Sequence, residues 1–405
     1  MEKNTNKPSI RFAEFTDAWE QRKLGDIGKT FTGLSGKTAD DFGHGEAKFL
    51  PYLNIFNNPI ADISFLESIE IDKSQNQIQY GDVFFTTSSE TPEEVGMSSV
   101  WLGKSANIYL NSFCFGFRPT IEFNHYYFGY LLRSDTFRKP ITILAQGISR
   151  FNISKTKVME IEIPLPSKDE QSKIGELFNN LDHLITLHQR ECEQLGNIKK
   201  ALLEKMFPSQ NEYTPKIRFK GFTDAWEQRK FEFFFNERDE RSGEGEMISV
   251  TINSGIKKFN ELNRYDSKPS DLSKYKKVIE GDIAYNSMRM WQGASGYSPY
   301  TGILSPAYTV ITPKYGNSSK FFAYILKRSE MIHQFEINSQ GLTKDTWNLK
   351  FPAFSQIITS APKQYEEQEK ISLTLLKLDH LITLHQRECE KLKNIKKSLL
   401  EKMFA

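Results

Sequence analysis

The chain has 405 residues, of which 38% are hydrophobic and 26% charged, with a formal net charge of +2, and this composition indicates a folded, soluble protein with more than one core. It contains no apolar run of about 18 residues and no signal-peptide start, which argues against a membrane or secreted protein. Three cysteines are too few for a secreted disulfide framework, so we expect a cytoplasmic protein.

The chain opens each of two halves with the same block. IRFAEFTDAWEQRKL begins at Ile10, and IRFKGFTDAWEQRKF begins at Ile217. Such internal similarity indicates a tandem duplication. We expect the apolar residues of the block to pin the start of each globular segment to its core, as a scaffold rather than a ligand site: Phe15, Trp19 and Leu24, and Phe222, Trp226 and Phe231.

GLSGKT at 33–38 resembles a phosphate-binding loop only in part. The pattern requires a glycine five residues before Gly36, and Phe31 occupies that position, so a plain turn is the preferred interpretation. The Asp/Asn-Pro-Pro-aromatic element of adenine methyltransferases is missing, NNPI at 57–60 being the nearest segment, and helicase and nuclease signatures are not visible. The sequence therefore predicts no catalytic residues in this chain.

Two globular segments, 10–168 and 209–364, mix short alternating apolar runs with turn residues. Each has a Gly-Asp strand, IQYGDVFFTTSS at 78–89 or VIEGDIAYNSM at 278–288, and a later QG element, AQGISRFNIS at 145–154 or SQGLTKDTWNL at 339–349. We expect one mixed α/β fold in both segments, with different surface loops. Only 209–364 has a clear excess of Lys and Arg, which permits nucleic-acid binding without requiring it.

The differing loops supply the candidate DNA readers, because Arg can bind guanine bidentately and Asn or Gln adenine, while Ser and Thr are less selective. Any one of them could equally be a solvated loop residue. In the first segment the candidates are Thr86, Thr87, Ser88, Ser89, Gln146, Ser149, Arg150 and Asn152. In the second they are Asn286, Ser287, Arg289, Trp291, Gln292, Gln340, Thr343, Lys344 and Asp345.

Each half closes with a predicted long helix, 169–208 and 365–405, and both helices contain LDHLITLHQRECE, at 181–193 and 378–390. Apolar residues recur every three or four positions, and a helix of roughly 36 residues is about 54 Å long. Ser167 can cap the first helix, with Glu170 reaching back. We expect an antiparallel coiled coil and a dumbbell with a pseudo-two-fold axis, since a parallel pair would require the second globular segment to carry the chain back along the whole helix.

The apolar arc of each helix is wider than a two-helix seam needs. This excess predicts a bundle with helices of another protein, through Leu184, Leu187 and Ile198, and Leu381, Leu384 and Ile395.

His188 and Cys192, with His385 and Cys389, lie at i and i+4 near the middle of each helix. An antiparallel pairing could assemble them as a Cys2His2 zinc site. We prefer the alternative, in which they are polar seam residues that fix the register, and predict no metal site. His183 and His380 are expected to face solvent.

The chain resembles the DNA-specificity subunit of type I restriction–modification systems along essentially its whole length. The resemblance rests on the two FTDAWEQRK openings, the two differing globular segments and the two LDHLITLHQRECE helices. It implies two target recognition domains, each reading one half of a split site in double-stranded DNA. It also implies an antiparallel spacer that docks two methyltransferase (modification) subunits. The physics agrees, since a rigid spacer can hold two readers about one helical turn of DNA apart.

The resemblance implies that the complex methylates adenine N6 with S-adenosylmethionine, and that added motor-nuclease (restriction) subunits cleave unmodified DNA with ATP and magnesium. Those cofactors would belong to the partner subunits, and this chain would need none. Two other classes stay open: a coiled-coil adaptor that joins two protein partners without DNA, and a metal-dependent nuclease that acts alone.

Overall fold

The computed structural model describes residues 7–209, 212–262 and 271–404. Contacts divide the chain into two compact units, and the division falls inside the long helices. Unit 1 comprises Met1–Arg190 and His385–Ala405, and unit 2 comprises Glu191–Leu384. Each unit therefore contains one globular domain and a part of each long helix.

Unit 1 is built on an antiparallel four-stranded sheet with the order β2-β9-β5-β7 (Gly28–Thr32, Cys114–Pro119, Val83–Thr86, Ser98–Val100). A three-stranded sheet has the order β4-β3-β8 (Glu67–Ile69, Phe42–Leu50, Ile108–Leu110). Two short antiparallel pairs complete the strands, β1 with β11 (Glu20–Lys23, Glu162–Leu165) and β6 with β10 (Ser88–Ser89, Phe151–Asn152).

The helices of unit 1 surround an aromatic core. They are α1 (Tyr52–Asn57), α2 (His125–Leu131), α3 (Asp135–Leu144), α4 (Lys155–Met159) and the first part of α5 (Lys168–Lys205), with short 3-10 turns at Leu24–Asp26 and Ala39–Asp41. Phe178 of α5 stacks on Tyr130 of α2 and on Phe404, which follows α10. The end of one helix block thus completes the core at the start of the other.

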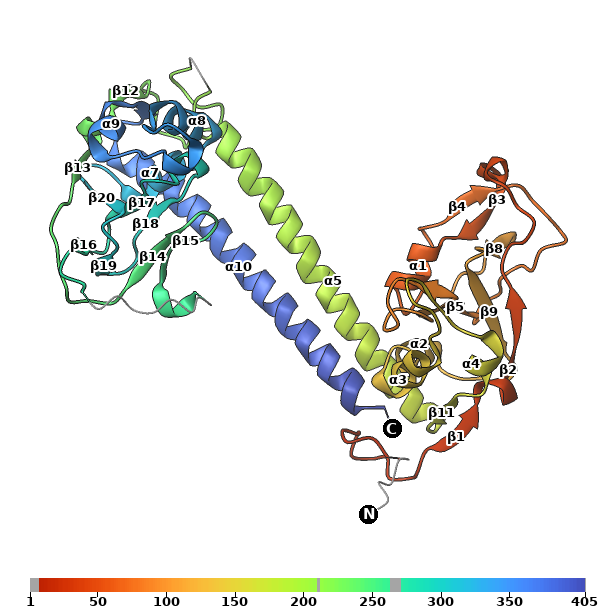
Figure 1. The fold of residues 1–405 in the computed structure, drawn as a ribbon. Coiled ribbons are helices and arrows are strands. Elements are labelled where there is room, and N and C mark those ends of the chain that lie inside the picture. The colour runs from red at the N-terminus through yellow and green to blue at the C-terminus, as the bar shows by residue number, and fades with distance from the viewer. Residues whose placement is uncertain (1–6, 210–211, 263–270, 405) are drawn as a thin grey trace. The chain divides into compact units, whose positions relative to one another are not determined.

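Unit 2 repeats the central sheet with the order β13-β20-β17-β18 (Phe235–Glu237, Tyr308–Pro313, Ile283–Asn286, Ser295–Tyr297). Three antiparallel pairs accompany it: β14 with β15 (Ile248–Thr251, Gly255–Lys258), β16 with β19 (Lys276–Val278, Gly302–Leu304) and β12 with β21 (Glu227–Lys230, Ile358–Ala361). The predicted mixed α/β fold is confirmed in both units (Figure 1).

The helices of unit 2 are α6 (Phe231–Phe234), α7 (Ser319–Ile325), α8 (Ser329–Asn338), α9 (Phe351–Gln356) and the first part of α10 (Tyr365–Lys402), with 3-10 turns at Phe259–Glu261, Met290–Gln292 and Lys344–Thr346. Phe207, just after α5, stacks on Phe321 and meets Trp226 edge-on. This contact matches the insertion of Phe404 in unit 1 and explains why both helix blocks end in Lys-Met-Phe.

The long helices α5 and α10 each contain 38 residues and lie side by side in each unit (Figure 1). In unit 1 Asp182 pairs with Lys396, and His188 meets His385, so the numbering rises along one helix as it falls along the other. In unit 2 Lys199 pairs with Asp379. The predicted antiparallel pairing is confirmed. Among the described residues, no helix has the length and apolar character needed to cross a membrane.

Candidate nucleic-acid interface

The shared opening block holds the helix ends of unit 1. Arg11 donates two hydrogen bonds to the Glu170 carboxylate, at 2.7 and 2.8 Å, and Trp19 Nε1 donates a third at 3.1 Å. Ile10 N donates to the carbonyl of Lys402 at 3.0 Å. The block therefore joins the start of α5 to the end of α10, in agreement with its predicted scaffold role. Trp19 and Leu24 lie in the core as predicted, whereas Phe15 is only partly buried and lies outside the core cluster.

Unit 2 contains the same arrangement. Arg218 donates two hydrogen bonds to Glu367, at 2.6 and 2.8 Å, and Trp226 Nε1 donates at 3.4 Å. Ile217 N donates to the carbonyl of Lys205 at 2.9 Å. The repeated opening block and the repeated helix block are therefore binding partners, which gives a structural reason for their duplication.

The prediction for the start of α5 was right about Ser167 and wrong about Glu170. Ser167 Oγ accepts a hydrogen bond from Glu170 N at 3.3 Å and so caps the helix. The Glu170 side chain does not reach back to the backbone, because Arg11 and Trp19 bind both of its oxygens. A buried carboxylate is better satisfied by a guanidinium and an indole than by one amide.

Asp182 and Asp379 occupy the same position in the two LDHLITLHQRECE copies and make the same contacts. Tyr130 donates its hydroxyl to Asp182 at 2.8 Å, and Lys396 of the opposite helix binds the same carboxylate. In unit 2, Tyr324 donates to Asp379 at 2.7 Å, and Lys199 is the opposite lysine. Each aspartate thus joins its globular domain to both helices, and burial together with the nearby carboxylate raises the pKa of each tyrosine.

The mid-helix histidines contact each other directly. His188 Nδ1 lies 2.9 Å from His385 Nδ1, so one ring donates and the other accepts. Cys192 Sγ donates to the Ile382 carbonyl at 3.7 Å. Within the described ranges no group of three or more His, Cys, Asp or Glu side chains is arranged to hold a metal ion. The register role of these residues stays a prediction. His183 and His380 are exposed, as predicted.

All six apolar residues predicted for partner binding are exposed. Their side chains are between 40% and 49% accessible. Unit 1 carries Leu184, Leu187 and Ile395, and unit 2 carries Leu381, Leu384 and Ile198. Each unit therefore presents two leucines and one isoleucine. The leucines lie near the middle of one long helix and the isoleucine lies in the second half of the other.

The Gly-Asp elements are turns that orient the central strands. Asp82 is buried and accepts two hydrogen bonds from Arg118, at 2.8 and 2.7 Å, and one from Gln79 N at 2.7 Å. Asp282 is bound in the same way by Arg238 and by Ile279 N. The preceding glycines have φ of +87° and +98°, which favours glycine. Strands β5 and β17 therefore leave these turns in the same geometry.

Four of the predicted DNA readers are buried, which corrects the prediction for them: Thr86, Ser88, Ser89 and Ser287. Thr86 Oγ1 accepts from Met97 N at 2.9 Å, and the Ser287 hydroxyl bonds to that of Thr309 at 2.8 Å. Thr86 is the last residue of β5, Ser88 and Ser89 form β6, which pairs with β10, and Ser287 directly follows β17. Pairing and packing beside the central sheets therefore bury these hydroxyls, which do not face a ligand.

The other predicted readers reach the surface. Exposed are Gln146, Ser149, Arg150, Asn152, Arg289, Gln340, Thr343, Lys344 and Asp345, and partly buried are Thr87, Asn286, Trp291 and Gln292. Arg150 Nε donates to Ser88 Oγ at 3.3 Å, and Lys344 lies 5.5 Å from the ring centres of both Trp291 and Trp347. In each domain the QG element thus lies beside the loop that follows the Gly-Asp strand.

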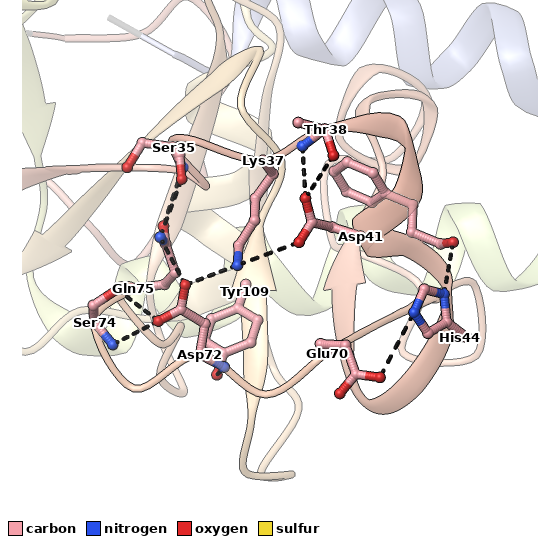
Figure 2. Close-up of polar contacts among 11 residues, drawn as sticks. Ser35, Lys37, Thr38, Asp41, His44, Glu70, Asp72, Ser74, Gln75 and Tyr109 are labelled. Atoms are coloured by element: carbon pink, nitrogen blue, oxygen red, sulfur yellow. Dashed lines mark hydrogen bonds and ion pairs between the residues drawn. The ribbon is translucent and has the colours of Figure 1, made fainter.

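The GLSGKT segment is a structural turn (Figure 2). Lys37 Nζ lies 2.8 Å from an Asp72 oxygen, and this pairing raises the pKa of the lysine. Ser35 exchanges two hydrogen bonds with Gln75, at 3.0 and 3.1 Å, while Thr38 caps a short turn through Asp41. Carboxylates surround the lysine where a phosphate loop would leave it free for a phosphate, in agreement with the predicted turn.

Comparison with known proteins places this fold in a family. Residues 16–197 and 217–394 each match the type I restriction modification DNA specificity domain. A Methanocaldococcus jannaschii protein that bears the name of a type I restriction enzyme specificity subunit (MjaX) is 23% identical over 98% of this chain and 95% of its own length. A second one from that organism, the MjaVIII specificity subunit, is 33% identical over 23% of this chain and 20% of its own.

A solved structure has the same fold. The crystal structure of the S subunit of a type I restriction–modification system from M. genitalium matches with a TM-score of 0.63 at 15% identity, over 98% of this chain and 99% of that one. With both globular domains and most of both long helices inside the matched residues, the chain belongs to the type I restriction–modification DNA-specificity family.

Proposed function

We propose that the two globular domains read the two halves of one split DNA site, and that the complex formed with this chain methylates adenine there. The observation that carries this proposal is the contrast between constant and variable parts. The two central sheets have the same strand order, and Arg11–Glu170 repeats as Arg218–Glu367, yet the loops beside the QG elements differ. Two recognition domains with the same scaffold and different loops are expected where one DNA site has two different halves.

The exposed loop residues are the proposed readers. Arg150 and Arg289 can bind guanine, and Gln146 and Gln340 can bind adenine, through paired hydrogen bonds in the major groove. Lys344, held over two tryptophan rings, is better placed to bind a phosphate than to read a base. The proposal excludes the four buried hydroxyl residues.

The exposed apolar residues of α5 and α10 are the proposed seats for two methyltransferase subunits. Single exposed aliphatic side chains are ordinary on protein surfaces, but the same set of three in each unit is the arrangement that two identical partners require. Motor-nuclease subunits would join the same complex. In this proposal the chain supplies recognition, and the partners supply the catalytic residues and cofactors.

A salt titration separates this function from that of a protein adaptor. If the assembled complex makes six to ten phosphate contacts, its affinity for the target duplex falls about 10³- to 10⁵-fold between 50 and 200 mM salt. An adaptor that uses apolar interfaces changes little over the same range. Salt-independent association with duplex DNA, or none at all, would contradict the proposed function.

A further inference from the structure

The two QG turns present the same unusual surface feature, an aliphatic side chain at the tip. Ile148 follows the first glycine and Leu342 follows the second, and both residues are fully exposed, with relative accessibilities of 97% and 101%. A hydroxyl residue and a cation come next in each case, as Ser149-Arg150 and Thr343-Lys344. Full exposure of a large aliphatic residue has no stabilising value for the free chain.

Both turns are held at their base by matching hydrogen bonds. Gln146 and Asn152 exchange two backbone bonds of 2.9 Å, and Gln340 and Asn348 exchange bonds of 3.1 and 2.9 Å. The residue after each closing asparagine binds the loop that follows the Gly-Asp strand, since Ile153 N donates to Thr87 O and Leu349 N donates to Ser287 O. Hydrogen bonds therefore attach both turns to the loops that directly follow the central strands β5 and β17.

Glycine is required for the shape of both turns. Gly147 has φ of +152°, and a Cβ there would lie 2.0 Å from the Arg150 carbonyl oxygen. Gly341 has φ of +153°, and its Cβ would lie 2.6 Å from the Thr346 carbonyl oxygen. The two domains have different loops, yet their QG turns share one backbone conformation. This conformation leaves the aliphatic side chain after the glycine in solvent.

Because both domains carry an exposed aliphatic residue at the tip of the QG turn, we expect this residue to do the same thing at both half-sites. Reading different base sequences calls for different side chains, and the loop after the second Gly-Asp strand has Arg289, Trp291 and Gln292, which the first domain does not repeat. Inserting an apolar wedge between stacked base pairs calls for a large aliphatic side chain in both domains, because every base step offers an apolar surface. The neighbouring hydroxyls of Ser149 and Thr343, together with Lys344, suit the adjacent phosphates, while Arg150 stays the proposed reader of a base.

We propose that Ile148 and Leu342 are wedges that enter the base stack of the two half-sites and open it. This inference rests on the proposed function and adds a mechanical step to it. A base that is to be modified must leave the stack, and unstacking costs free energy. Side chains that occupy the opened step would lower that cost for the partner that receives the base.

The test uses the full chain assembled with its methyltransferase subunits and a duplex of the motif methylated in the host. 2-Aminopurine, whose fluorescence rises on unstacking, replaces one base of each half-site in turn. Ile148→Ala should abolish the fluorescence rise in the half-site of the first domain only, and Leu342→Ala in the other. Loss of the buried methyl groups should weaken binding about 10- to 50-fold.

Matched controls separate the wedge from other roles. Ile148→Leu and Leu342→Ile keep an aliphatic tip and should retain the fluorescence rise. A full fluorescence rise in both alanine variants would overturn the wedge. The wedge would also be overturned if the wild-type complex lost as much affinity when uracil replaces thymine in the duplex, since that result indicates reading of the thymine methyl. A wild-type complex that binds no duplex would overturn the proposed function itself, and the inference with it.

Discussion

Glu170 is a buried charge whose partners come from the opening block. Only 1% of its side chain is accessible, and Arg11 faces it at 13%. Glu170→Gln leaves the guanidinium without its counter-charge, and breaking a buried pair from one side costs about 3–5 kcal/mol. We expect the variant to lower the free energy of unfolding of unit 1 by that amount, as measured by hydrogen exchange at equilibrium.

Two comparisons sharpen this measurement. Glu367→Gln should have the same effect in unit 2, because Arg218 and Trp226 repeat the arrangement. Glu14→Gln removes the exposed partner of Lys173 and should leave stability unchanged. If all three variants lowered the free energy of unfolding by the same small amount, the opening block would not hold the helix ends.

Helices α5 and α10 meet at a pair of identical histidines, which permits a test of the seam. His188→Leu or His385→Leu leaves one ring nitrogen without its partner, a loss of about 1–3 kcal/mol, whereas replacing both rings by apolar groups is close to neutral. We therefore expect each single variant to lower the thermal unfolding temperature and the double variant to recover it. Additive losses would contradict the direct contact.

The long helices were predictable from sequence because they depend on local periodicity. The expected ranges 169–208 and 365–405 compare with Lys168–Lys205 and Tyr365–Lys402 in the structure. The roles of Asp182 and Asp379 were not predictable, since their partners Tyr130 and Tyr324 lie more than fifty residues away in sequence. Their identical repetition was the available signal, yet only the apolar, histidine and cysteine positions of the repeat carried an interpretation.

The candidate interface was predictable in position but not residue by residue. The QG and Gly-Asp patterns located both loops, yet Thr86 and Ser287 are buried, because tertiary packing decides which hydroxyls of a loop face inward. Ile148 and Leu342 were missed since polarity was the criterion for a reader. Comparing the two QG elements position by position would have found them.

At the scale of the whole molecule, the account requires one partner seat in each unit. Leu184→Glu with Leu187→Glu places two charges in the seat of unit 1 and should cost one methyltransferase subunit, because unpaired charges in an apolar interface are expensive. Adding Leu381→Glu and Leu384→Glu should cost both. Native mass spectrometry gives the stoichiometry, and Lys200→Glu, at an exposed position of α5, is the control. Two bound partners in the fourfold variant would place the seats elsewhere.

Methylation-sensitive single-molecule sequencing of host DNA, with and without this gene, tests the central claim most directly. The account predicts that N6-methyladenine disappears at one split motif when the gene is removed. Replacing residues 215–364 by the corresponding segment of another family member should change one half of that motif and leave the other half intact. An unchanged methylation pattern in a host whose partner subunits are expressed, or a change in both halves after the exchange, would contradict the account.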